Sequence, residues 1–466
     1  DAYNVAIGHL AGENMTTGTN NTIMGGLAAD ALTIGHNNIA IGYKALSTSV
    51  DGDYNVAIGY AALEDYEDGD GNGHNTAIGS SSQTNASTGE FNTSLGSLSM
   101  GVGVVTGDNN VAIGYRAGED LTTGTMNTMI GAYAAYTLTG GIRNTALGYG
   151  ALAKSVDGDK NTAIGYLALE DYEGADGEGH NTAVGNESQL NATTGEYNTS
   201  LGSLSMGVGV TTGDHNIAIG YNALTALTIG NNNVGIGSGA LDALVGGTSN
   251  VAIGKAALST NIASGKNVAV GYDALVFADK STDAENVAVG YGVGKTITTG
   301  YSNTLIGANS GDGITIGRHN VALGANSLSA SGAGSKSVAI GKGTLVAQQP
   351  QFTDATCDTT SGGTNVTCNA NTLILVGQIV SGTGFASTAS ITAIAESGGA
   401  ETGVTSFTVG TAANASATNT TLTFKHGVDS FNTAVGFSAG NAVTTGTQNT
   451  LIGGLAGDAL TTGGNN

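Results

Sequence analysis

The feature that most constrains the fold is a five-residue unit that returns about every seventeen residues. The unit reads Asn, a β-branched residue, a small residue, a large apolar residue and Gly, as in "NVAIG" at residues 4–8. It occurs in 22 coils, and 16 of the 22 intervals up to the terminal Asn466 are 17 residues long. Seventeen residues are too few to bury a core alone, so successive coils must stack on one another.

We number each coil from its Asn as position 1. Position 2 is β-branched, position 4 is large and apolar, and position 5 is Gly in all 22 coils. Side chains two residues apart share one face of a strand, and β-branched residues favour strands. We therefore expect about two short strands and two turns per coil, with Asn and Gly at the corners and position 4 stacked in the core. This is an all-β, parallel β-solenoid, roughly 105 Å long at the usual strand spacing.

The Asn at position 1 is expected to form a ladder, because amide side chains stacked in register can hydrogen-bond the Asn above and below. The sequence places this ladder at residues that include Asn4, Asn21, Asn38, Asn55, Asn161 and Asn250.

A longer repeat lies on top of the coil repeat. The stretch "NTSLGSLSMGVGV" begins at Asn92 and again, letter for letter, at Asn198. Six coils, with their longer members in the same order, separate Asn55 from Asn161 and Asn161 from Asn267. Duplicating whole coils lengthens a solenoid without disturbing its core, which favours a fibre over a catalytic domain.

Position 3 points to the opposite side of the strand from positions 2 and 4. A solvent-exposed face would carry polar residues at this position, but the sequence does not. Position 3 is Ala in 15 of 22 coils and charged in none. An exposed apolar stripe of this length would promote aggregation, so we expect it to pack against other copies of the chain. The alternative is a thin solenoid in which the same chain encloses both faces.

Repeats such as "NVAIGYAAL", "NTAIGYLAL" and "NVAIGKAAL" resemble the head repeats of trimeric autotransporter adhesins. They resemble equally the repeat regions of phage tail fibres. The resemblance covers about residues 1–345 and 430–466. It implies a left-handed parallel β-roll, three chains per fibre, an extracellular place on a virion or cell surface, and attachment to a glycan or protein receptor.

The repeat is interrupted once. Residues 346–429 separate the solenoid of residues 1–345 from its continuation at 430–466, and runs such as "NTLILVGQIV" and "TSFTVG" predict a small all-β insert. The insert holds both cysteines, Cys357 and Cys368, for which we expect a disulfide, with two free thiols as the alternative.

One turn carries a candidate metal site. In "DGDGNG", Asp68, Asp70 and Asn72 have the alternate spacing of a calcium loop, but the glutamate expected later in the loop is missing. A solvated acidic turn is the other interpretation, and no other cofactor is predicted. Tyr recurs at position 6, where it either packs between coils or chains or offers its rings to sugars.

Charge and hydropathy narrow the function. The chain has 13 Lys and Arg against 36 Asp and Glu, a net charge of −23, which argues against binding nucleic acid or anionic membranes. No run of apolar residues is long enough to insert into a membrane. Without a nucleophile elbow, a zinc motif or an outstanding acid pair, we expect a non-enzymatic fibre. The rival hypotheses are a self-assembling extracellular filament subunit and a glycan-depolymerising tail spike.

Overall fold

The structure is a computed structural model. It describes residues 2–66, 73–174, 179–280, 282–329, 334–348, 351–371, 374, 376, 378–385, 388–396, 404–425 and 428–466. The chain falls into two compact units, Asp1–Asn233 and Val234–Asn466. Both are built from coils of a parallel β-solenoid with a period of about 17 residues, which confirms the fold class expected from the repeat.

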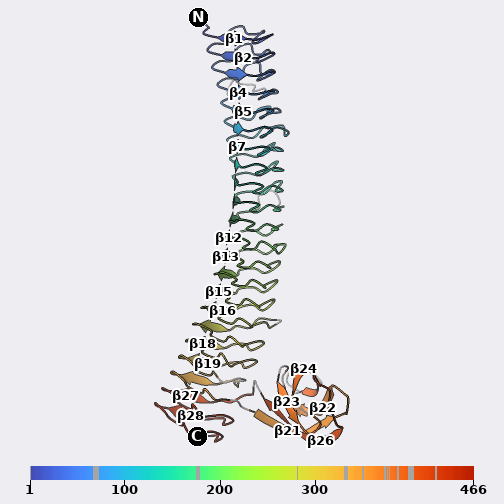
Figure 1. Cartoon of the computed structure of the whole chain (residues 1–466), viewed down its shortest axis with the longest axis vertical. Coiled ribbons are helices and arrows are strands. Elements are labelled where there is room, and N and C mark those ends of the chain that lie inside the picture. The colour runs from blue at the N-terminus through green and yellow to red at the C-terminus, as the bar shows by residue number, and fades with distance from the viewer. Residues whose placement is uncertain are drawn as a thin grey trace. The chain divides into compact units, whose positions relative to one another are not determined.

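The first unit is a stack of coils that each contribute one three-residue strand (Figure 1). Neighbouring strands are parallel and paired residue for residue, so that Val5 lies opposite Thr22 and Ile7 opposite Met24. The strands are β1 (Val5–Ile7), β2 (Thr22–Met24), β3 (Ile39–Ile41), β4 (Val56–Ile58), β5 (Thr76–Ile78), β6 (Thr93–Leu95), β7 (Val111–Ile113), β8 (Thr128–Ile130), β9 (Thr145–Leu147), β10 (Thr162–Ile164), β11 (Thr182–Val184), β12 (Thr199–Leu201) and β13 (Ile217–Ile219).

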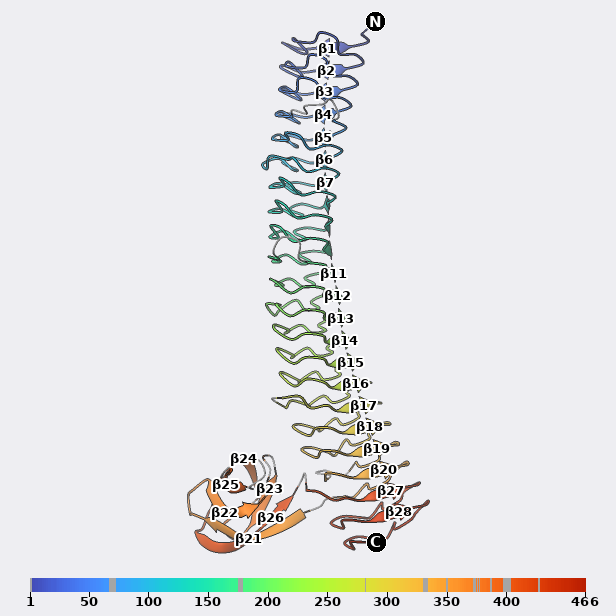
Figure 2. The same ribbon diagram turned by 180° about the vertical axis from the view of Figure 1, so that it is seen from behind.

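The second unit continues with the same coils and then carries the insert. Its solenoid strands, visible along one side of the coils in Figure 2, are β14 (Val234–Ile236), β15 (Val251–Ile253), β16 (Val268–Val270), β17 (Val287–Val289), β18 (Thr304–Ile306), β19 (Val321–Leu323), β20 (Val338–Ile340), β27 (Thr433–Val435) and β28 (Thr450–Ile452). Strand β20 pairs directly with β27, although the insert separates them in sequence. The repeat therefore resumes in register.

The insert is a closed antiparallel barrel of six strands in the order β21-β22-β25-β24-β23-β26. Its core holds Val366, Phe407, Leu422 and Phe424. The strands are β21 (Gln351–Thr359), β22 (Asn365–Asn371), β23 (Ile379–Gly382), β24 (Ala389–Glu396), β25 (Val404–Val409) and β26 (Ala417–Lys425).

The Gly at position 5 ends each solenoid strand. Gly131 adopts φ +133°, and a Cβ at this residue would lie 2.3 Å from the carbonyl oxygen of Gly148 in the next coil. Only Gly accepts both the positive φ and this close approach of two backbones. Among the described residues each coil has one strand, which ends at this Gly, so the expectation of two strands per coil is wrong.

Left-handed backbone at non-glycine residues forms the rest of each coil. In the coil that begins at Asn38, Lys44, Leu46 and Tyr54 have φ of 57°, 55° and 57°. Each such residue costs about 1 kcal/mol or more in isolation. All three donate a backbone N–H to a carbonyl of an adjacent coil, at 3.0, 2.9 and 3.0 Å. Stacking of the coils therefore stabilises a backbone that one coil could not hold.

The two faces of the strand are reversed relative to the expectation. Position 3, represented by Ala40, Ala163 and Ala252, is completely buried inside its own chain. It packs with the residues at positions 8 and 9, such as Ala45 and Leu46. Position 4 does stack from coil to coil, but on the outer face. Position 9, which is Leu or Met in most coils, shares the interior with position 3, so position 3 is mostly Ala, while positions 2 and 4 lie outside.

Candidate interaction surface

The outer face of the strand column is the surface most in need of a partner. It consists of positions 2 and 4, which carry only Val, Ile, Leu, Met and Thr and no charge in 22 coils. In the first unit Leu95, Leu147 and Leu201 are 44%, 40% and 47% exposed, and in the second Ile253 and Ile306 are 38% and 41% exposed. We call this the aliphatic face. A contiguous apolar strip of this kind on a soluble protein marks an interaction surface.

The Tyr residues of position 6 pack chiefly on one another. The ring centroids of Tyr43 and Tyr60 lie 5.7 Å apart and those of Tyr272 and Tyr291 lie 5.5 Å apart, with nearly parallel planes. A ring face that is covered by the ring of the next coil cannot also stack on a sugar. This favours coil-to-coil packing over glycan stacking for the paired rings.

A second aromatic column occupies the residue before the Asn. His74 is stacked between Tyr54 and Phe91 at 4.7 and 4.9 Å. In the next copy of the six-coil repeat Tyr197 is stacked between His180 and another His at 4.8 and 5.0 Å. These rings stand on left-handed backbone, and the pair of His74 with Phe91 returns in the second copy as His180 with Tyr197, so the duplication preserved part of this surface column as well as the core.

The Asn of position 1 lies inside the coil and joins one coil to the next. Oδ1 of Asn21 accepts the backbone N–H of Asn38 at 2.8 Å, and Nδ2 of Asn21 donates to the carbonyl of Gly35 at 2.8 Å. From Asn110 to Asn144 the Nδ2 also donates to Oδ1 of the preceding Asn, at about 3.1 Å. The ladder is therefore a side-chain-to-backbone chain, with amide-to-amide bonds in some coils only.

The predicted ladder residues take part in this pattern. Asn4, Asn38, Asn55 and Asn161 each accept the backbone N–H of the following Asn, at distances from 2.8 to 3.0 Å. Asn250 accepts the N–H of Asn267 at 3.0 Å and donates to the carbonyl of Ser264 at 3.0 Å. Within the described part of the chain, Nδ2 of Asn55 and Asn161 has no partner. Each is the first residue of a 20-residue coil, part of whose turn lies outside the described residues.

Carboxylates gather at position 10 of several coils. Glu64 forms an ion pair with Lys44 of the neighbouring coil at 2.6 Å. Asp242 and Asp312 each have one carboxylate oxygen buried without a hydrogen-bond partner among the described residues. Burial raises the pKa of both carboxyl groups above the ordinary value. Hydrogen bonds from backbone N–H groups lower the pKa, but by less. Burial likewise raises the pKa of Glu119, although Arg116 lowers it.

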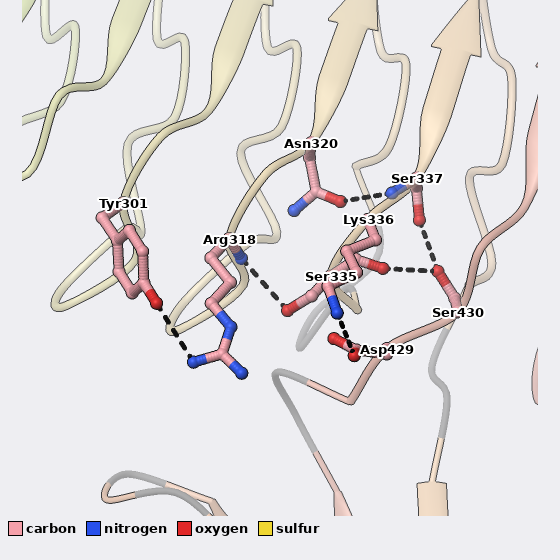
Figure 3. Close-up of polar contacts among 8 residues, drawn as sticks. All are labelled: Tyr301, Arg318, Asn320, Ser335, Lys336, Ser337, Asp429 and Ser430. Carbon is pink, nitrogen blue, oxygen red and sulfur yellow. Dashed lines mark hydrogen bonds and ion pairs between the residues drawn. The ribbon is translucent and has the colours of Figure 1, made fainter. Parts of the chain in front are cut away.

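Polar contacts close the gap where the insert leaves the solenoid (Figure 3). Ser337 and Ser430, which stand near the ends of the interruption, are joined by their hydroxyl groups at 2.5 Å. Lys336 and Asp429 form an ion pair at 2.6 Å. Ser337 takes the place of the repeat's Asn, and its N–H still donates to Oδ1 of Asn320 at 3.0 Å. The ladder therefore reaches the junction.

The candidate calcium ligands and the two cysteines lie in different parts of the chain. Asp68, Asp70 and Asn72 lie outside the described residues, so the calcium site stays a prediction. Cys357 and Cys368 are free thiols in this structure, with sulfur atoms within 4.8 Å of each other, and the disulfide between them stays a prediction. Asp354, which no sequence pattern indicated, joins this pair because of an irregularity in the pairing of β21 with β26.

Comparison with known proteins adds no family. A scan against protein-family models finds no match, and a search of curated proteins finds no significantly similar sequence. The described residues include no helix that is long and apolar enough to cross a membrane.

Proposed function

We propose that the chain is a non-enzymatic structural fibre that attaches to a surface, and that it works as a homotrimer. The observation that carries the proposal is the aliphatic face, which runs along the strands of both units without a charged residue. A parallel strand column with aliphatic side chains pointing outward suits the packing of like columns against one another. The number of copies, three, rests on the resemblance to adhesin heads and tail fibres.

The repeat architecture supports the fibre role. Coils can be added by duplication without changing the core, and the six-coil repeat shows that this happened. The place of action that fits is outside the cell, on a virion or a cell surface, where a net charge of −23 keeps long particles apart and soluble. The receptor proposed is a cell-surface glycan or protein, recognised by groups other than the aliphatic face.

The experiment is a mass measurement by light scattering on the wild type and on face variants. Leu95→Lys with Leu201→Lys places charges on the aliphatic face of the first unit at two half-exposed residues. We expect the wild type to have the mass of three 45.6 kDa chains and the double variant that of one, with unchanged far-ultraviolet circular dichroism. Thr123→Lys, at an exposed turn, is the matched control and should remain a trimer.

A buried-column variant separates folding from assembly. Ala163→Lys introduces an ammonium group at a completely buried position inside one chain, so it should unfold neighbouring coils rather than dissociate folded copies. A wild-type mass of a single chain, or an undisturbed trimer that carries both face lysines, would end the trimer proposal.

A further inference from the structure

The barrel insert gathers three metal-ligating side chains on its inside. They are Asp354 and Cys357 on β21 and Cys368 on β22. One ligand atom from each lies within 4.8 Å of the other two. Cys357 is completely buried, Asp354 is 9% exposed and Cys368 is half-buried.

One strand pairing and one bulge bring these residues together. Strand β21 pairs with β22 antiparallel at Asp358 and Thr367, which sets Cys357 opposite Cys368. Asp354 and Cys357 are three residues apart and would point to opposite faces of a regular strand. A bulge between them, where β21 has one residue more than its partner β26, turns both toward the same side.

The surroundings hold the ligands in place. Oδ1 of Asp354 accepts the backbone N–H of Thr356 at 2.9 Å and its hydroxyl at 2.6 Å. Cys357 lies in the apolar core that also contains Val366 and Phe407, and Cys368 packs against that core. A carboxylate held by neighbouring hydrogen-bond donors, beside apolar side chains, is the arrangement found around bound metal ions.

The donor chemistry selects the ion. Two thiolates with one carboxylate favour a borderline-soft divalent ion of the zinc class over calcium or magnesium, which prefer oxygen ligands. A disulfide would involve the two sulfur atoms only, whereas this cluster also contains a buried carboxylate. We propose that the insert, with its cysteines reduced, binds one zinc-class divalent cation through Cys357, Cys368 and Asp354.

Cobalt is the probe. The full chain, kept reduced and stripped of metal with a chelator, is titrated with Co²⁺. We expect one Co²⁺ per chain, with a thiolate-to-cobalt charge-transfer band and the strong visible bands of a four-coordinate site whose fourth ligand is water, both lost on addition of Zn²⁺. Cys368→Ser should abolish most of the charge-transfer intensity. Asp354→Asn should keep the band and weaken Co²⁺ binding at least tenfold.

The matched control is Asp358→Asn, on the same strand. Its carboxylate accepts the N–H of Asn419 at 2.7 Å and is not in the cluster, so Co²⁺ affinity should fall far less than in Asp354→Asn. A readout that needs no variant is alkylation of the wild-type thiols, which Zn²⁺ should slow at least tenfold. A reduced chain that binds Co²⁺ without the sulfur band, or is alkylated at the same rate with Zn²⁺, overturns the proposal. Equal Co²⁺ affinity in the Asp354→Asn and Asp358→Asn variants would show that Asp354 is not a ligand.

Discussion

A Cβ placed on Gly118 would lie 2.7 Å from both Sδ and Cε of Met129, which stands in the next coil. Gly118 is at position 9 and Met129 at position 3. Most coils have the opposite arrangement, as in Leu46 at position 9 packed under Ala57 at position 3 of the next coil, both completely buried. The two positions therefore share one fixed volume of the core.

This sharing predicts a compensating pair of substitutions. Gly118→Leu alone should overpack the core and cost about 1–3 kcal/mol or more, and Met129→Ala alone should leave a cavity and cost about 2–5 kcal/mol. The double variant recreates the Leu and Ala pair of other coils, and Leu46 shows that Leu accepts the φ of this position. We expect most of the lost stability to return, as measured by thermal unfolding in a double-mutant cycle. Additive losses would contradict the shared volume.

The same relationship shows how far the sequence could lead. The 17-residue period, the parallel strand and the apolar columns all follow from residue types at fixed spacing. Alternation separates positions 2 and 4 from position 3 but does not say which face is inside. The side-chain sizes at positions 9 and 3 do indicate the inner face. Position 9 is Gly wherever position 3 of the next coil is large, as it is at Ile23, Met129, Leu305 and Leu451. A position whose side chain is large only where a neighbouring core position is small lies in the core as well.

Other features had no local signal. Leu46 and Tyr54 adopt left-handed backbone that isolated residues of their type avoid, because hydrogen bonds from neighbouring coils hold it. The cluster of Asp354 with the cysteines depends on a bulge in a barrel whose pairing is set by distant strands. Such features are decided by tertiary contacts, so spacing along the chain does not reveal them.

The Asn ladder predicts a large loss at a single residue. In the first unit, Asn144 accepts the N–H of Asn161 at 2.9 Å and donates to the carbonyl of Gly158 at 2.7 Å, in a buried place. Asn144→Ala should leave both groups unsatisfied and cost about 2–4 kcal/mol. Amide hydrogen exchange should show faster exchange at Asn161. Thr123→Ala, at an exposed turn, is the control and should leave both stability and exchange unchanged.

The junction predicts that the solenoid does not require the barrel. Strands β20 and β27 pair directly, and Gly436 donates its N–H to the carbonyl of Ile340 at 2.7 Å. Replacing residues 351–425 with a short Gly/Ser linker should keep this bond, because the ion pair of Lys336 with Asp429 and the hydroxyl contact at Ser337 both remain. The measurement is exchange protection of the Gly436 amide. Loss of protection there, with the other coils intact, would show that the insert supports the junction.

The position-10 carboxylates predict a pH-dependent gain from removing charge. The pKa of Asp242 is raised by burial, so the folded chain binds this proton more tightly than the unfolded chain does. Ionisation of the group therefore lowers the free energy of unfolding as the pH rises through the carboxyl range. Asp242→Asn should raise the melting temperature at neutral pH. Solvent screens a partly exposed carboxyl group, so we expect a gain of only about 1–2 °C.

The gain should disappear in acid, below the ordinary carboxyl pKa of about 4, where Asp242 is protonated in both the folded and the unfolded chain. Asp312→Asn should behave in the same way, because burial is also the main cause of its raised pKa. Glu64→Gln is the contrasting variant at the same coil position. Its carboxylate is paired with Lys44 at 2.6 Å, so its removal should not stabilise the chain at neutral pH. Melting curves at neutral and acid pH test all three, and a gain for Asp242→Asn that is equal at both pH values would show that ionisation is not its cause.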